Sequence, residues 1–212
     1  MFRKTFPVGR FQCNCSILAD EQTKQAIVVD PGDELSKILM PLAEQKFLVV
    51  AIVHTHAHLD HFGATADLAR VTTAKTYLHP DDNFLHALAD EQAQLLGLAV
   101  PPQGTIDMPL KDDMSICFGQ YELAVMHTPG HTPGSCCFHV LNEDLCLAGD
   151  TLFAGGIGRT DLWGGDEKQI VRSIEQRLYR LNGAVQVIPG HGPMTSIDRE
   201  RQTNPFVRLA SS

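Results

Sequence analysis

Three histidines and an aspartate follow one another within six positions, directly after a short apolar segment at residues 47–53. They are His56, His58, Asp60 and His61. Imidazole nitrogen and carboxylate oxygen suit zinc, manganese or iron, and no thiolate stands in this run to complete a closed structural zinc site. His56 and His58 share one face of an extended strand end, whereas the adjacent Asp60 and His61 cannot easily turn toward the same centre. The run therefore predicts half of a dinuclear metal site.

Three later segments share one local form, in which an apolar strand stops at a glycine-rich turn that carries one ligand. The candidate ligands in these turns are His131, Asp150 and His191. Glycine and proline fix tight loops at strand ends, and such loops present ligands without crowding. Together with the four residues of the first run they make seven ligands. Seven ligands can serve two metals if Asp150 lies between them.

Composition limits the classes of protein that the chain can represent. With 212 residues, 43% of them hydrophobic, it is long enough to bury a sizeable core. Its 17 basic and 25 acidic side chains give a net charge of −8, which disfavours nucleic acid and anionic membrane surfaces as partners. No apolar run reaches the length of a signal peptide or membrane span, and the six cysteines show no Cys-x-x-Cys spacing. We expect a cytoplasmic protein with a small-molecule substrate; the sequence leaves its oligomeric state open.

Short strand patterns alternate with helical ones, and no low-complexity linker divides the chain. The expected strands are at residues 16–19, 25–29, 47–53, 76–78, 115–118, 121–126, 135–140, 145–148 and 185–188. The expected helices are at residues 34–44, 63–70, 81–97 and 167–181, followed by a helical tail. Mostly apolar strands separated by helices imply sheets covered by helical layers. The sequence thus predicts an α/β fold in a single domain over residues 1–212.

The seven candidate ligands, taken in order, resemble the complete motif series of the metallo-β-lactamase superfamily, spread across nearly the whole chain. The resemblance implies that family's fold, a four-layer αβ/βα sandwich. It also implies two divalent transition-metal ions, with zinc expected and iron or manganese as alternatives. By position in the motifs, one metal is held by His56, His58 and His131, and the other by Asp60, His61 and His191, with Asp150 between them.

Three shorter segments narrow the resemblance to the short type II glyoxalase branch. They are Gly-Arg-Thr-Asp at residues 158–161, Pro-Gly-His-Gly-Pro at 189–193 and Asn-Pro-Phe at 204–206. This branch implies hydrolysis of glutathione thioesters such as S-lactoylglutathione to glutathione and a hydroxy acid. Long hydroxyacylglutathione hydrolases add a helical C-terminal domain that grips glutathione, and we expect this chain to lack it. They also carry a basic residue in the loop that corresponds to Arg159, which makes Arg159 the candidate substrate-binding residue.

The expected nucleophile is a hydroxide that bridges the two metals, because cations lower the pKa of bound water from 15.7 toward about 7. No serine or cysteine nucleophile is evident in the motifs. Asp60 is the candidate catalytic residue, as the group that orients this hydroxide and accepts a proton. A thioester suits such a site because its leaving thiolate, with a conjugate-acid pKa of roughly 8.5, departs with little protonation.

Other functions are also compatible with these motifs. A mononuclear-iron persulfide dioxygenase shares the histidine run and a similar Gly-Arg-Thr-Asp segment, and lactone or β-lactam hydrolysis is chemically feasible at the same metals. A nuclease of the superfamily is disfavoured by the acidic charge. His54 and His127 border the motifs and are expected to support the site without binding metal. Asp30 is either a supporting partner or a turn residue, and Arg159 is alternatively a solvated loop charge.

Overall fold

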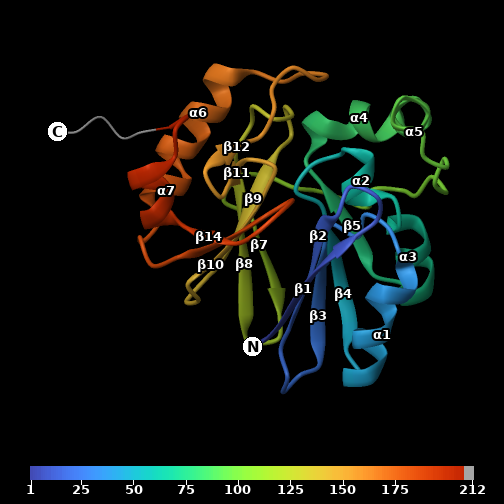
Figure 1. Cartoon of the computed structure of the whole chain (residues 1–212). Helices are drawn as coiled ribbons and strands as arrows, with labels where there is room; N and C mark the ends of the chain where they lie inside the picture. The colour runs from blue at the N-terminus through green and yellow to red at the C-terminus, as the bar shows by residue number, and fades with distance from the viewer. Residues whose placement is uncertain (208–212) are drawn as a thin grey trace.

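Two six-stranded sheets lie face to face in the structure, a computed structural model that describes residues 1–207 (Figure 1). The first sheet has the order β1 (Phe2–Val8), β2 (Cys13–Ala19), β3 (Gln25–Val29), β4 (Leu48–Val53), β5 (Lys75–Leu78) and β6 (Met108–Pro109). The second has the order β14 (Thr195–Ser196), β13 (Gln186–Pro189), β10 (Leu145–Gly149), β9 (Cys136–Val140), β8 (Tyr121–His127) and β7 (Ser115–Phe118). Helices cover the outer sides of the sheets (Figure 1). The expected four-layer αβ/βα sandwich is confirmed.

The helices divide between the two outer layers and one end of the molecule. Beside the first sheet lie α1 (Leu35–Gln45), α2 (Leu59–Phe62) and α3 (Thr65–Thr72), and beside the second lie α6 (Glu167–Gln176) and α7 (Ile197–Thr203) (Figure 1). The shorter elements are the 3-10 turns η1 (Pro80–Asp82) and η2 (Leu178–Arg180), helices α4 (Asn83–Ala87) and α5 (Ala89–Leu96), and the hairpin of β11 (Leu152–Phe153) and β12 (Gly156–Ile157). None of the helices described is long and apolar enough to cross a membrane.

Strand direction explains why the candidate ligands gather at one edge of the sheets. β3 and β4 are parallel in the first sheet, and β10 and β13 are parallel in the second. β8 and β10 are both antiparallel to β9, so they also point the same way. Parallel strands present their carboxyl ends at a common edge, where the loops of α/β proteins form sites. Each of the segments that follow β4, β8, β10 and β13 carries candidate ligands.

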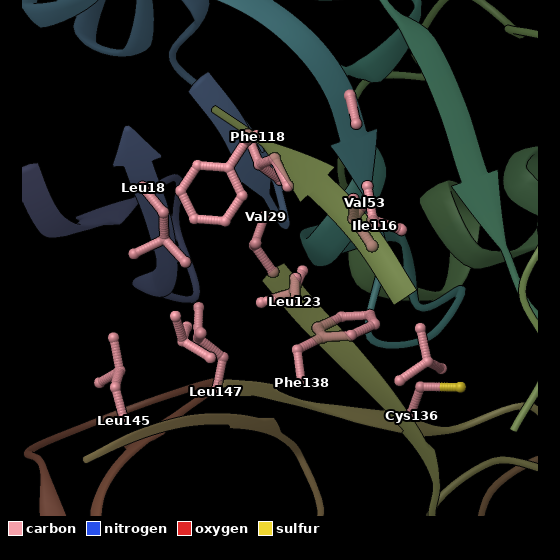
Figure 2. Close-up of a cluster of buried hydrophobic side chains, with 14 of the residues drawn as sticks. Leu18, Val29, Val53, Ile116, Phe118, Leu123, Cys136, Phe138, Leu145 and Leu147 are labelled. Carbon is pink, nitrogen blue, oxygen red and sulfur yellow. The ribbon is translucent and has the colours of Figure 1, made fainter. Parts of the chain in front are cut away.

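The central core lies between the two sheets. Figure 2 shows Leu18, Val29 and Val53 of the first sheet together with Phe138 and Leu147 of the second. All five are buried, with at most 3% of their surface exposed. Burying such side chains removes apolar surface from water and is the main favourable contribution to folding. This layer therefore holds the sheets, and with them the ligand-bearing strand ends, in a fixed relation.

Each sheet is also covered on its outer face by apolar helix residues. Ile38 and Leu42 of α1 and Leu68 of α3 pack against the first sheet. Ile170 and Ile174 of α6 pack against the second. The central strands of both sheets are therefore covered on both faces. They are apolar in nearly every position and do not show the alternation of apolar and polar residues that is typical of a half-exposed strand.

The prediction of one long helix at residues 81–97 is wrong. The segment instead forms η1, α4 and α5, and the chain bends at Leu88 between α4 and α5. The break keeps Leu85, Ala89 and Ala93 facing one buried cluster beneath the histidine run. Tertiary packing therefore overrides the helical pattern. The helix expected at 167–181 likewise stops at α6, and η2 follows it.

Strand β1 is an element that the sequence pattern did not reveal. It pairs antiparallel with β2 along its whole length and forms the edge of the first sheet. Its burial does not alternate, since Arg3 and Lys4 are both exposed. Pro7 is tolerated because an edge strand has one side without ladder hydrogen bonds. Its lack of alternation is the reason that the pattern failed to indicate a strand here.

Candidate metal centre

The first group of ligand atoms comes from the end of β4 and the turn after β8. His56 Nε2 lies 3.1 Å from His58 Nδ1, and His131 Nε2 lies 3.2 Å from the former and 2.9 Å from the latter. All three side chains are buried. Nitrogens around a tetrahedral zinc ion at about 2.0–2.1 Å are themselves separated by a little over 3 Å. The spacing of the three nitrogens therefore suits one transition-metal ion.

A second group lies beside the first. His61 and His191 approach each other at Nε2 to 3.2 Å, and Asp60 Oδ2 lies 3.2 Å from His191 Nε2 and 3.8 Å from His61 Nε2. Helix α2 begins at Leu59, so Asp60 and His61 stand on a helical turn, whereas His58 is still extended. This change of backbone is what turns the second pair away from the first, as the sequence predicted.

Asp150 lies between the two groups. Its Oδ1 is 3.5 Å from His61 Nε2, and its Oδ2 is 3.6 Å from His131 Nε2 and 3.7 Å from His191 Nε2. Oδ1 is buried and has no hydrogen-bond partner within residues 1–207. A buried carboxylate oxygen without a partner is costly unless a cation or another donor meets it. The seven residues thus converge, and their donor set fits two cations that share Asp150.

The protonation preferences of the histidines differ between the two groups of ligands. Burial, reinforced by the nearby His131, lowers the pKa of His58 to about 3, so that its imidazole is neutral. Burial alone would raise the pKa of Asp60, but His61 and His191 outweigh it and hold the carboxyl below its ordinary value. Neutral imidazole and ionised carboxylate are the forms that bind metals. His61 and His191 differ, because neighbouring acidic groups outweigh burial and raise the pKa of each ring, so a metal would displace their protons.

Groups behind the ligands fix the orientation of their rings. His61 Nδ1 donates to Asp30 Oδ2 at 3.0 Å, which leaves Nε2 to face the centre. Thr55 donates to both oxygens of Asp30 through its backbone N–H and hydroxyl, and His56 Nδ1 donates to the same hydroxyl at 3.0 Å. Such partners set the ring nitrogen that is available to a metal. Of the two interpretations left open for Asp30, the supporting role is the one that the contacts favour.

Two of the other three rings donate to backbone carbonyls, and the outer Nε2 of His58 has no partner among the described residues. His131 Nδ1 donates to the carbonyl of Arg159 at 2.8 Å, and His191 Nδ1 donates to the carbonyl of Phe11 at 3.0 Å. His54 is placed differently, because both of its ring nitrogens are engaged, with the carbonyl of Tyr77 and the hydroxyl of Thr65. His54 therefore has no nitrogen free to meet a metal, in line with the supporting role expected for it.

The centre opens into a cavity of about 620 Å³. Five of the candidate ligands line it, namely His58, Asp60, His131, Asp150 and His191. Its other walls are mainly apolar side chains from the β1–β2 turn, α5 and the loop after β12, namely Phe11, Leu95, Leu96, Leu162 and Trp163. A mostly apolar cavity with polar groups gathered at one place is the usual form of a small-molecule site.

Arg159 lies in the wall of this cavity, but its side chain is already paired. Its Nε and Nη2 donate to the two carboxylate oxygens of Asp161 at 2.7 and 2.9 Å. Both side chains are largely exposed, 58% and 70% respectively. The pairing raises the pKa of Arg159 and lowers that of Asp161 to about 2, so both are charged. If Arg159 binds a substrate carboxylate as predicted, its guanidinium must first leave Asp161.

Several supporting residues were missed in the sequence. Asn14 Nδ2 donates to the carbonyls of Pro189 and Gly192 and so holds the loop that carries His191. Gly190 has no room for a side chain, since a Cβ there would lie 2.0 Å from Asp150 Oδ1. The glycine is visible in the sequence as a turn residue, whereas Asn14 belongs to a strand far from every motif and carries no local signal.

The sequence model of the metallo-beta-lactamase superfamily matches residues 8–191. The chain belongs to the metallo-beta-lactamase superfamily. The resemblance inferred from the motifs is therefore confirmed, and the protein is a metal-dependent hydrolase by family. An uncharacterized protein of Aquifex aeolicus is 40% identical over 97% of both chains. Hydroxyacylglutathione hydrolase GloC of Haemophilus influenzae is 35% identical, again over 97% of both.

Solved structures of the superfamily agree in fold. BLEG-1, described as a B3 metallo-beta-lactamase, superimposes with a TM-score of 0.90 at 33% identity, over 97% of this chain and 99% of its own. TTHA1623 in a di-iron-bound form gives 0.87 at 38% identity, over 98% and 100%. ETHE1 from Myxococcus xanthus gives 0.80 at 26% identity, over 97% and 84%. These relatives share the fold of this superfamily member while their names point to different chemistry.

Proposed function

We propose that this protein is a dinuclear-metal hydrolase of glutathione thioesters, with S-lactoylglutathione as the type of substrate and glutathione and a hydroxy acid as products. The observation that carries the proposal is the convergence of two groups of three ligands on either side of Asp150. The 35% identity to a hydroxyacylglutathione hydrolase over almost the full length of both chains supports the choice of substrate.

The residues present fit two transition-metal ions, with zinc as the first choice. His56, His58 and His131 would hold one ion, and Asp60, His61 and His191 the other, with Asp150 shared. When bound, such cations lower the pKa of a coordinated water and polarise a carbonyl oxygen. The nitrogen and oxygen donors also suit iron, which the similarity to a protein in a di-iron-bound form keeps as the alternative.

Asp60 is the proposed catalytic residue. It lines the cavity, and its neighbouring imidazoles keep its carboxyl ionised. An ionised carboxylate accepts hydrogen bonds, so Asp60 can orient a water molecule toward a substrate carbonyl and take up its proton. The second oxygen of the same carboxylate can meet the metal, because Oδ2 already lies 3.2 Å from His191 Nε2. One side chain therefore both completes the metal site and positions the attacking water.

The cavity walls suit the remaining parts of a thioester. Leu95, Leu96 and Trp163 form apolar surface that excludes water from the sulfur and carbonyl. Glutathione also carries carboxylates, and Arg159 is the basic side chain in the wall that can meet one. Its present partner, Asp161, is exposed, and exposed ion pairs contribute little to stability. A substrate carboxylate can therefore replace Asp161 without a large cost.

Two other reactions have a specific observation in their favour. The similarity to a B3 metallo-beta-lactamase at a TM-score of 0.90 favours β-lactam hydrolysis, and lactones are chemically related substrates. The similarity to ETHE1 and to a di-iron form fits an iron-dependent persulfide dioxygenase. Both reactions use the same histidine run, so the arrangement of ligands does not separate them from thioester hydrolysis.

One set of measurements distinguishes the three. The purified protein is analysed for bound metals, then assayed under strictly anaerobic conditions for thiol release from S-lactoylglutathione, with a chromogenic β-lactam as a parallel substrate. Oxygen uptake is measured separately with glutathione persulfide. We expect two metal ions per chain and thiol release without oxygen. One tightly held iron together with oxygen uptake would establish the dioxygenase, and turnover of the β-lactam alone would establish the lactamase.

A further inference from the structure

A buried carboxylate outside the metal centre holds two of its loops together. Asp82 belongs to the turn η1, and its side chain is fully buried. Its Oδ2 accepts from the backbone N–H of Ala57 at 2.9 Å and from the hydroxyl of Thr132 at 2.8 Å. Its Oδ1 accepts from the backbone N–H of Gly134 at 2.6 Å. Ala57 stands between two ligand histidines, and Thr132 follows directly after a third.

From this geometry we propose that Asp82 is a positioning residue that sets the metal affinity of the group formed by His56, His58 and His131. Among the described residues Asp82 forms no hydrogen bond with any of the three rings, yet its two oxygens connect the loops from which all three project. One loop follows β4 of the first sheet, and the other follows β8 of the second. The carboxylate is therefore a clamp across the two halves of the sandwich, at the place where their ligands must meet.

The surroundings of Asp82 admit little besides a carboxylate. Its three partners are all donors, so an amide in its place would set an N–H group against at least one of them. Gly134 approaches so closely that a Cβ there would lie 2.7 Å from Asp82 Oδ1. No basic side chain pairs with Asp82 among the described residues. A buried carboxylate without a basic partner is tolerated only where its hydrogen bonds offset the free-energy cost of removing it from water.

The second group of ligands is oriented by other residues. His61 donates to Asp30, and His191 donates to the carbonyl of Phe11. Neither of these contacts involves Asp82. Loss of the clamp should therefore weaken one metal site and spare the other, which general destabilisation of the fold would not do. This inference rests on the proposed dinuclear centre, but it does not depend on the identity of the substrate.

The test is the substitution Asp82→Asn, with Asp81→Asn as the matched control. Asp81 is the preceding residue, and its side chain is 58% exposed. Among the described residues its carboxylate forms an ion pair with His79 alone, at 3.7 Å. The metal-free proteins are titrated with Zn²⁺ against a competing chelator, and Co²⁺ absorption spectra report the geometry of each ion. For Asp82→Asn we expect about 10-fold to 100-fold weaker binding of one of two ions, the range typical of lost outer partners. The other ion should bind within a few-fold of wild type.

Rescue provides the readout that a purely structural role would not give. Excess metal should restore kcat of Asp82→Asn with KM unchanged, and Asp81→Asn should match wild type throughout. Thr132→Val removes one of the three donors and should give a smaller loss at the same ion. Equal weakening of both ions, or unchanged affinities with a lower melting temperature alone, would overturn the clamp. If the wild type binds one ion only, the dinuclear proposal fails, and the effect of Asp82→Asn on that ion still decides the inference.

Discussion

Two clusters of histidines in this molecule differ in the orientation of their rings. At the metal centre His56, His58 and His131 meet edge to face, with interplanar angles of 82°, 84° and 88°. His79 and His127 instead lie flat on each other, with centroids 4.0 Å apart and planes inclined by 8°. The lone pair of an imidazole nitrogen lies in the plane of its ring, so parallel rings cannot aim two lone pairs at one ion. The first cluster can bind a metal, and the second is a packing contact.

The cause of the difference lies in what holds each ring. His56 and His131 are turned by hydrogen bonds from their outer nitrogens to Thr55 and to the carbonyl of Arg159, whereas the outer Nε2 of His58 has no partner among the described residues. In the stacked pair, His127 Nε2 meets the carbonyl of Pro133, and His79 Nδ1 accepts from the backbone N–H of Asp81. The partners of His56 and His131 thus leave the Nε2 atoms of these two rings free to face a metal.

The largest effect is expected for Asp150→Ala. This change removes the carboxylate that lies between both groups of ligands, so both ions should bind more weakly. Loss of the cations removes several kcal/mol of stabilisation from the transition state, and thiol release should fall by at least about 10³-fold. Elemental analysis after dialysis, beside wild type at the same metal concentration, measures the first effect. Two ions retained at wild-type affinity would show that Asp150 is not shared.

A smaller effect is expected for Asp60→Asn. The amide can still accept a hydrogen bond through its oxygen, but it cannot take up a proton. With metal supplied to saturation, kcat should fall by about 10²-fold while KM changes only a few-fold, because the lost interaction belongs to the transition state. Steady-state kinetics on S-lactoylglutathione at several metal concentrations measures both constants. If added metal alone restored kcat, Asp60 would be a ligand without a catalytic role.

The sequence was sufficient to name the candidate ligands that lie together in the structure, but not the residues that orient them. All seven candidate ligands stand in segments that follow apolar strands, a pattern visible in the sequence, and the structure adds the common direction of β8, β10 and β13 that brings these segments to one edge. Asp82 meets partners 25 and 52 positions away in the sequence, and these partners are backbone groups with no recognisable pattern. The bend at Leu88 was missed for a related reason, since packing against the histidine run decides it.

For Arg159→Ala we expect a still smaller effect, which is confined to the binding of the substrate. A carboxylate of glutathione lies far from the scissile bond, so its contact stabilises ground and transition states alike. KM for glutathione thioesters should rise about ten-fold, kcat should stay within a few-fold, and small thioesters without the carboxylate should be unaffected. Asp161→Asn is the matched variant, because it frees the guanidinium that Asp161 now holds and should lower KM. Unchanged KM in both variants would assign Arg159 to the solvated loop.

The smallest effect is expected for the stacked pair. Burial, and next the neighbouring His127, lower the pKa of His79, against the opposing charges of Asp81 and Asp112. Near and below the ordinary histidine pKa of about 6.5, His79 is therefore protonated more readily in the unfolded chain than in the folded one. Protonation of His79 thus lowers the free energy of unfolding as the pH falls through that value. His79→Phe keeps a ring for stacking and removes this titration.

The melting temperature of His79→Phe should therefore improve relative to wild type as the pH falls from 7.5 to 5.5, by about a degree or two. Thermal unfolding at matched pH values measures the difference. The metal content should stay at two ions, because the parallel rings of His79 and His127 do not form a metal site. Loss of an ion from this variant would mean that His79 and His127 bind metal despite their stacking, and would remove the distinction between the two histidine clusters.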